Sequence, residues 1–308
     1  MNQLPILIRR EFWENRVIFL VLPIIISGFF LFIMSLTVLV APAEGVDLTL
    51  KIEGSDDIQL LDDSVQSDNI YILALYRLEG LPSEERVRYV NTGLQILAGP
   101  LIIVLWFVIF VYLLNSLYAD RRDRSIFFWK SMPVSDSITV FSKLLTGLWL
   151  VPVFYLFCVA VLQAAALVII GFVTIGTEIS MRQTIWEPVS LFSNWMQYIW
   201  ACLLYSFWAM PFFGWLILVS AYSKSVPLVW VVTIPSGLAV IEKNVIDQSL
   251  LSDWLWNHTD PMSFIDMNKL NSDAFWNQVV SLQMASAIIV GGLLIAIAIW
   301  VRGRVNET

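Results

Sequence analysis

The chain has 308 residues, of which 58% are hydrophobic and only 14% are charged, and its mean hydropathy is +0.75. This composition excludes a typical soluble globular domain, in which about a quarter of the residues are charged. The formal net charge is −7, and the sequence has no basic surface of the kind that binds nucleic acid. We therefore expect an integral membrane protein that does not bind nucleic acid.

The first residues predict an amphipathic helix that lies in the membrane interface and leads into the first span. The apolar residues Leu4, Ile8 and Phe12 recur every four positions, which places them on one face of a helix. The charged residues Arg9, Arg10 and Glu14 lie between them in the sequence. Such a helix buries its apolar side at the headgroup boundary. A simple cytoplasmic extension of the first span is the alternative. Glu11 and Glu14 disfavour a cleaved signal peptide, because such leaders avoid acidic residues.

Six uncharged apolar runs are candidate transmembrane helices, since about 20 apolar residues cross the hydrocarbon core. They are Val17–Val40, Leu94–Tyr118, Leu144–Val173, Met196–Tyr222, Val226–Ile241 and Val279–Val301. The fifth run is short and contains Pro235 and Gly237, so a bent or re-entrant segment is also open for it. In the sixth run, the small pairs Ala287/Gly291 and Gly292/Ala296 predict close helix packing.

The polar segment 43–93, which follows the first span, predicts a small external α/β insertion. Apolar and polar residues alternate from Val46 to Glu53, a pattern typical of a half-buried strand. Ser83-Glu84-Glu85 predicts a helix start, because acidic residues in a first turn favour the helix dipole. About fifty residues cannot build much core alone. The insertion is therefore expected to rely on the spans or on a partner copy.

The segment 242–278, between the fifth and sixth spans, carries several tryptophans, among them Trp254 and Trp256. Trp favours the membrane–water boundary, so we expect short helices on the outer surface. Anchoring is their default role, and gating of cargo at Trp254, Trp256 and Pro261 is the alternative. The only histidine, His258, is interpreted as a surface residue, because a lone His without clustered Cys or carboxylates is rarely a metal ligand.

Basic residues predict the orientation of the helices. On the side of both termini, the connector 119–143 and Lys224, basic residues outnumber acidic ones. The basic residues on this side are Arg9, Arg10, Arg16, Arg121, Arg122, Arg124, Lys130, Lys143, Lys224, Arg302 and Arg304. The acidic residues on the same side are Glu11, Glu14, Asp120, Asp123, Asp136 and Glu307. Short basic loops stay in the cytoplasm. Both termini and the connector are therefore expected inside, with 43–93 and 242–278 outside.

The connector Ala119–Lys143 reads ADRRDRSIFFWKSMPVSDSITVFSK and carries most of the functional signal. Its aromatic centre, Ile126–Lys130, suits a partner's groove, and the flanking charges suit orientation of that partner. An interfacial helix with its aromatics in lipid is the alternative. The residues expected to couple the chain to a partner are Arg121, Arg122, Asp123, Ser125, Ile126, Phe127, Trp129, Lys130 and Pro133.

This connector resembles the cytoplasmic connector between the second and third spans of type-2 ABC exporter permeases. Those connectors have a charge cluster, a Gly-Thr/Ser pair, a short amphipathic helix, a Leu-Pro-Val-Ser break and a lysine that opens the third span. The corresponding positions here are Asp120–Asp123, Ser125, Ile126–Lys130, Met132–Ser135 and Lys143. Arg124 departs from the family, which usually has glycine there. Asp253–Phe264 is similar to the family's outer segment, in which aromatic residues precede a proline.

The resemblance implies an all-α integral membrane protein, with residues 1–308 forming one permease domain of six transmembrane helices. It implies a bacterial cytoplasmic (inner) membrane subunit that pairs in lipid with a second copy or a paralogue. Two copies of a cytoplasmic ATP-binding subunit would bind MgATP and push on the connector, and substrate would move outward. The chain has no G-x-x-x-x-G-K-[ST] motif. We therefore expect ATP hydrolysis only in the partner subunit. As a permease subunit, this chain is expected to be no enzyme and to have no catalytic residue, cofactor or metal site of its own.

Other classes remain open. A secondary transporter or channel would be favoured by an internal repeat or by a charged residue inside a span, because ion-coupled transporters keep such groups as relays. The sequence shows no repeat, and no run contains Asp, Glu, Lys, Arg or His. A membrane-embedded enzyme would need acids that converge near an interface, and only the outer segments carry such acids. A non-transporting anchor of an ATPase-linked sensor complex would share the topology. The uncharged spans favour an amphipathic or apolar cargo.

Overall fold

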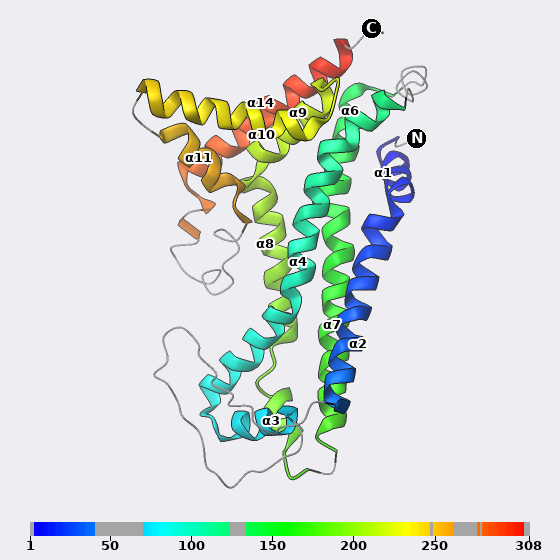
Figure 1. Cartoon of the computed structure of the whole chain (residues 1–308), viewed down its shortest axis with the longest axis vertical. Helices are drawn as coiled ribbons and strands as arrows, with labels where there is room; N and C mark the ends of the chain where they lie inside the picture. The colour runs from blue at the N-terminus through cyan, green and yellow to red at the C-terminus, as the bar shows by residue number, and fades with distance from the viewer. Residues whose placement is uncertain are drawn as a thin grey trace. The chain divides into compact units, whose positions relative to one another are not determined.

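The computed structural model describes residues 3–40, 70–123, 134–175, 177–246, 249–261, 276–277 and 279–304, which are mainly helical (Figure 1). In chain order the elements are α1 (Gln3–Glu14), η1 (Val17–Val21), α2 (Leu22–Val40), α3 (Ile70–Gly80), α4 (Ser83–Arg122), α6 (Asp136–Leu145), η2 (Thr146–Leu150), α7 (Val151–Val173), η3 (Arg182–Trp186), α8 (Leu191–Trp208), α9 (Met210–Tyr222), α10 (Pro227–Ile241), η4 (Glu242–Ile246), α11 (Leu250–Thr259) and α14 (Leu282–Arg304). The η elements are π-helical turns. These described residues include no strand, and the predicted strand Val46–Glu53 lies outside them.

Four helical stretches in the described part of the chain are long and apolar enough to cross a membrane. They are Val17–Leu39, Ser83–Arg122, Asp136–Val173 and Leu282–Arg304, with a fifth if α8 and α9 make one bent span. α10 lies at the expected fifth span, but its 15 residues reach only about 22 Å, short of a ~30 Å core. The described helices thus suit a multi-pass membrane protein, whereas the count of six spans stays a prediction.

α4 is the longest helix and begins at Ser83, as the sequence predicts. Glu84 and Glu85 lie in its first turn, and Arg121 and Arg122 lie in its last turn. Both placements favour the helix dipole. The helix has 40 residues and is therefore about 60 Å long, twice the thickness of the hydrocarbon core. It joins part of the predicted insertion to the second span without a break.

The helix at the expected fourth span bends at Ala209. α8 ends at Trp208, α9 begins at Met210, and their axes meet at 62°. Ala209 has φ −87° and ψ 15°, which lies outside the α region. Pro211 follows in the first turn of α9, where its missing N–H costs no intrahelical hydrogen bond. The uniform apolar run predicts the helix here but not its break.

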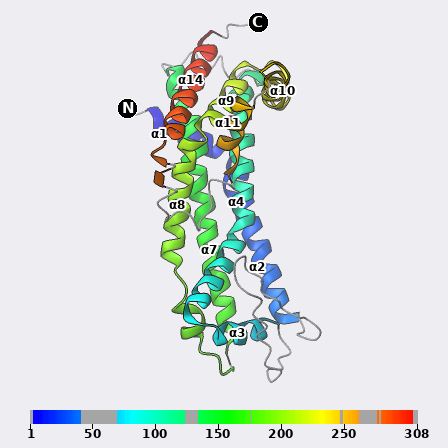
Figure 2. The ribbon, with the colours of Figure 1, turned by 90° about the vertical axis from the view of Figure 1, so that its left-hand side faces the viewer.

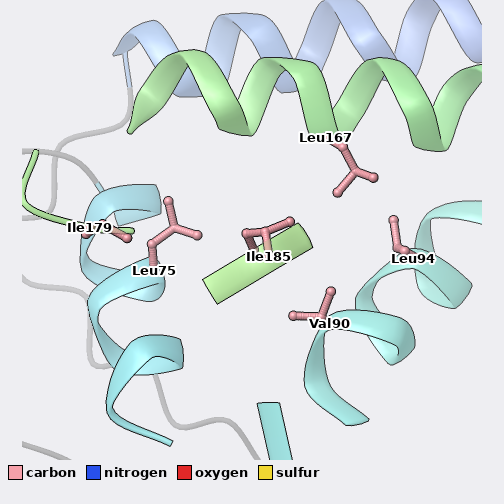
Figure 3. Packing of buried hydrophobic residues seen from close by; sticks show 6 residues of the cluster. All are labelled: Leu75, Val90, Leu94, Leu167, Ile179 and Ile185. Carbon is pink, nitrogen blue, oxygen red and sulfur yellow. The ribbon is translucent and has the colours of Figure 1, made fainter. Parts of the chain in front are cut away.

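The chain divides into two compact units. Unit 1 comprises Met1–Leu20, Ile103–Leu156 and Met196–Thr308, and unit 2 comprises Val21–Ile102 and Phe157–Trp195. In unit 2, α3 and the start of α4 pack on α7 around a buried cluster (Figure 3). Its members are Leu75, Val90, Leu94, Leu167, Ile179 and Ile185. The described half of the insertion therefore relies on residues of the spans for its core, as its small size predicts.

Arg86 joins α3 to α4 and η3 within unit 2. Its guanidinium donates to the carbonyls of Leu78, Glu79 and Leu81 at 3.0, 2.6 and 2.9 Å. It also donates to the carbonyl of Gln183 at 3.1 Å. The last carbonyls of a helix have no intrahelical donor, and a cation there also complements the helix dipole. Arg86 is thus the C-terminal cap of α3.

α14 packs along α9 in unit 1 (Figures 1 and 2). A Cβ atom at Gly291 would lie 2.5 Å from the backbone carbon of Met210, and one at Gly214 would lie 2.9 Å from the carbonyl oxygen of Gly291. These distances leave no room for a side chain, so the two backbones approach as the Ala287/Gly291 pair predicts. Gly292, from the other predicted pair, faces open space.

Gly291→Ala should destabilise the protein by about 1–3 kcal/mol, because the added methyl group would overpack a backbone contact that cannot move aside. Gly292→Ala is the matched control, since its methyl group would meet nothing within 4 Å. Thermal unfolding of the purified variants in detergent measures both. Equal unfolding temperatures for the two variants would contradict the close approach of α9 and α14.

Candidate functional site

The connector between the second and third spans is described at both of its ends. α4 ends at Arg122 and α6 begins at Asp136. Ser135 caps α6, since its Oγ accepts a hydrogen bond from the N–H of Ile138 at 3.3 Å, a common role of Ser at this position. The central coupling residues lie outside the described residues, and their role stays a prediction. They are Ser125, Ile126, Phe127, Trp129, Lys130 and Pro133.

Lys143, the last residue of the connector, forms buried ion pairs with two carboxylates. Its side chain is only 2% exposed, and its Nζ donates to Glu11 Oε1 at 2.9 Å and to Asp120 Oδ1 at 3.3 Å. Asp120 lies at the end of α4, so this ion pair joins one end of the connector directly to the other. Glu11 lies on α1. One ammonium group therefore fastens α1, α4 and α6 together.

Glu11 occupies a polar site formed by three elements. Besides Lys143, its Oε1 faces Arg10 Nη2 at 3.3 Å, and its Oε2 accepts a hydrogen bond from the Tyr112 hydroxyl at 3.0 Å. A buried carboxylate is tolerated when its oxygens are paired in this way. α1 therefore turns a charged residue inward, together with Leu7. The interfacial position predicted for this helix is not tested by these contacts.

Arg302 adds the last span to the same cluster. Its side chain is 4% exposed, Nη1 donates to Asp120 Oδ2 at 3.2 Å, and Nε donates to Asp136 Oδ1 at 3.0 Å. Asp120 thus faces three cations: Lys143 and, at 3.9 Å, Arg10 on Oδ1, and Arg302 on Oδ2. We call this group of six residues the base cluster: Arg10, Glu11, Asp120, Asp136, Lys143 and Arg302. It contains three carboxylates and three cations, and its member Arg10 also pairs with Glu14 at 2.7 Å.

Arg121, Arg122 and Asp123 flank the base cluster and differ in environment. Arg121 turns inward and donates to the carbonyls of Ser220 and Ser223 at 2.6 and 2.8 Å, at the C-terminus of α9. Arg122 and Asp123 form a 3.0 Å ion pair with both side chains well exposed. The described end of the connector therefore has an exposed charged part available to a partner and an arginine that holds α9.

The segment 242–278 contains α11, whose last carbonyls are capped by aromatic donors from α8. Trp208 Nε1 donates to the carbonyl of Asn257 at 3.0 Å, and the Tyr205 hydroxyl donates to that of Thr259 at 2.9 Å. Of the predicted gating residues, Trp254 is half-buried and donates to Ser286 Oγ at 3.3 Å. Trp256 is 74% exposed, and Pro261 is partly buried just after α11.

His258 is fully buried, so its interpretation as a surface residue is wrong. Its ring stacks on Trp208, with centroids 4.5 Å apart, and lies 4.3 Å from the ring of Trp254. Nδ1 is 2.7 Å from the carbonyl oxygen of Trp254 and therefore donates to it. Within the described part of the chain, no three His, Cys, Asp or Glu side chains come together to hold a metal ion. His258 is a packing residue of this aromatic group.

Glu242 caps α11 at its other end. Its carboxylate oxygens accept the backbone N–H groups of Leu251 and Ser252 at 2.5 and 2.9 Å. Hydrogen bonds from first-turn N–H groups favour the ionised form. The Leu251 N–H, followed by that of Ser252, therefore lowers the pKa of Glu242 below its ordinary value of 4.5. A ten-residue helix is marginal alone, so α11 depends on caps supplied by other elements.

Sequence reasoning located the connector but missed most of the base cluster. The sequence marks Lys143 as the residue that opens the third span and Asp120 as part of the connector's charge cluster, but it does not indicate that either residue contacts Glu11 or Arg302. The available signal was their position, because each lies beside an uncharged span on the same predicted side. Their pairing depends on which span ends meet, and sequence spacing does not contain that information.

No family model matches this chain, and neither a curated protein nor a solved structure shows significant similarity to it.

Lys143→Met should destabilise the protein by about 3–5 kcal/mol, because Glu11 and Asp120 would lose the nearer of the two cations that they share. Arg122→Met is the control, since its pair is exposed and contributes about 0–1 kcal/mol. The double variant Glu11→Gln/Lys143→Met should recover much of the loss, because Asp120 keeps Arg302. Thermal unfolding in detergent gives all three values. A Lys143→Met variant as stable as Arg122→Met would contradict a buried ion-pair cluster.

Glu242→Gln should lower the unfolding temperature at neutral pH, because the amide caps α11 less well than a carboxylate. The folded-state pKa lies below the ordinary value of 4.5, so the carboxylate stabilises fully above that value. Its contribution is lost as pH falls through the folded-state pKa. The gap between wild type and variant should therefore close in acid. Glu178→Gln, at an exposed position, should show no such gap, and a constant gap at all pH values would refute the charged cap.

Proposed function

We propose that this chain is the membrane-spanning permease subunit of an ATP-driven exporter of the type-2 ABC class. The observation that carries the proposal is the ion pair between Lys143 and Asp120, which joins the two ends of the connector. Glu11 of α1 pairs with this Lys143, and Arg302 of α14 pairs with this Asp120, so both helices are bound to the same cluster. A connector anchored in this way delivers a force from the aqueous phase to several helices at once. An ordinary loop between two spans has no need for such an anchor.

The proposed topology has six transmembrane helices, with α10 as a short fifth span and α1 in the cytoplasmic interface. Both termini and the connector lie in the cytoplasm of a bacterial cell, and the segments 43–93 and 242–278 lie outside its inner membrane. The excess of Arg and Lys on the connector side supports this orientation. The segment 43–93 forms an external insertion that includes a strand.

The proposed partners are two cytoplasmic ATP-binding subunits and a second permease copy or paralogue. The connector segment Ile126–Lys130 supplies aromatic anchors, which dominate the energy of protein interfaces. Exposed charges such as Arg122 and Asp123 orient the partner and affect mainly the rate and salt dependence of assembly. The sequence has no phosphate loop, so MgATP binding and hydrolysis belong to the partner.

In this mechanism, closure of the ATP-binding subunits pushes on the connector. The push reaches the base cluster, where α1, α4, α6 and α14 meet, and moves these helices together because their charges are paired. Interhelical movement then exposes the cargo to the outside. The uncharged spans suit an amphipathic or apolar cargo, because no fixed charge in them would bind an ion.

The isolated chain should show no ATPase activity, and purification from native membranes should bring an ATP-binding protein with vanadate-sensitive ATP turnover. Phe127→Ala/Trp129→Ala should lose this partner, since each truncated hot-spot residue costs roughly 2–4 kcal/mol. The matched control is Phe141→Ala/Trp149→Ala, a second exposed Phe and Trp pair in the same part of the chain. Hydrolysis by the isolated chain, or wild-type assembly and turnover in the connector variant, would refute the assignment.

A further inference from the structure

Both ends of α14 are bound to segments that matter for the proposed cycle. At its C-terminal end, Arg302 bridges Asp120 and Asp136 at the two ends of the connector. Near its N-terminal end, Ser286 Oγ accepts a hydrogen bond from Trp254 of α11 at 3.3 Å. Sixteen positions separate Ser286 from Arg302, which is about 24 Å along a helix. One helix thus joins the base cluster to the outer segment inside a single compact unit.

The middle of α14 cannot slide independently of its neighbour. The backbone of Gly291 fits against Met210 and Gly214 with no room for a side chain. Close-packed interfaces resist small shifts and move between discrete arrangements. α9 in turn begins at the break after Trp208, whose ring stacks on His258 of α11. A displacement of α14 is therefore passed to α11 by two routes, one through Ser286 and one through α9.

Arg302 differs sharply from Arg304, the neighbouring arginine on the same helix. Arg302 is buried and donates to two carboxylates through two different nitrogens. The guanidinium of Arg304 is 4.1 Å from the centre of the Trp300 ring on its own helix and forms no ion pair among the described residues. Of these two arginines, Arg302 is the one that ties α14 to the connector, because a contact within one helix transmits nothing to another element.

We infer that α14 carries movement of the connector to α11, and that Arg302 is the positioning residue that fastens α14 to the connector. This inference rests on the proposed function, because the movement starts from a partner's push. It assigns to the last span a role that neither the charge pattern nor the connector sequence indicates. α11 responds to ATP bound in the cytoplasm because one stiff helix, held at Arg302 and at Ser286, joins the base cluster to α11.

The first test follows α11 in the complex with the ATP-binding subunit. A single cysteine replaces the exposed Trp256, with Cys158 and Cys202 changed to Ala, and its labelling rate with an impermeant maleimide is compared without nucleotide and with ATP plus vanadate. The parent should show a rate difference, and Arg302→Leu should abolish it while assembly persists. Arg304→Leu should keep the difference. An unchanged difference in Arg302→Leu, or none in the parent, overturns the inference.

Asp136→Asn is a milder variant for the case in which Arg302→Leu does not fold. Its side chain is one-third exposed, and the Arg302–Asp120 pair remains, so the variant should reach the membrane and show a reduced rate difference. A wild-type difference in Asp136→Asn, together with loss of Arg302→Leu from the membrane, would reduce Arg302 to a folding role and overturn the inference.

The second test needs no partner. Amide hydrogen exchange in Leu250–Thr259 of the isolated chain should be faster in Arg302→Leu than in the parent. The expected increase is a factor of about 2 to 30, which corresponds to the usual effect of a mutation on the coupling energy between distant sites. Arg304→Leu should leave it unchanged. Failure to assemble with an ATP-binding subunit would refute the proposed function, whereas unchanged exchange in Arg302→Leu would refute the link through α14 itself.

Discussion

An ammonium group that is removed from water needs paired charges or hydrogen-bond acceptors, and Lys143 imposes this condition on the end of unit 1 where α1, α4, α6 and α14 meet. Removing an ion from water costs several kcal/mol even after relaxation of the protein. Lys143 obtains its partners from α1 and α4. Asp120 then carries a second oxygen that needs a donor, and Arg302 of α14 supplies it. Each pairing creates the next requirement, so four helices meet at one point.

The apolar pattern was sufficient to predict the helices but not their interruptions. Long uncharged runs place most of the spans, and Ser83 begins α4 because its acidic first turn is a local signal. The bend at Ala209 has no such signal, since the residues around it are as apolar as the rest of the run. Pro211 marks a helix start only once the break is known. Pro235, which suggested a broken fifth span, lies inside an unbroken α10.

The candidate site was predictable as a segment but not as a set of contacts. The aromatic connector stands out because such a sequence is unusual between two spans. Glu11 and Arg302 are separated by almost the whole chain, and nothing local distinguishes Arg302, which is buried, from Arg304, which is not. His258 shows the same limit, because its burial depends on two tryptophans, one in α8 and one in α11.

Burial also separates two kinds of electrostatic interaction in the connector. Salt screens exposed charges strongly at distances beyond about 10 Å and screens buried pairs much less. The Arg122–Asp123 pair lies in water, whereas the Lys143 pairs are almost fully desolvated. Ionic strength should therefore act on how the connector meets a partner and leave its attachment to the helices intact. In the proposed permease, a soluble subunit therefore binds and dissociates without loosening the base cluster.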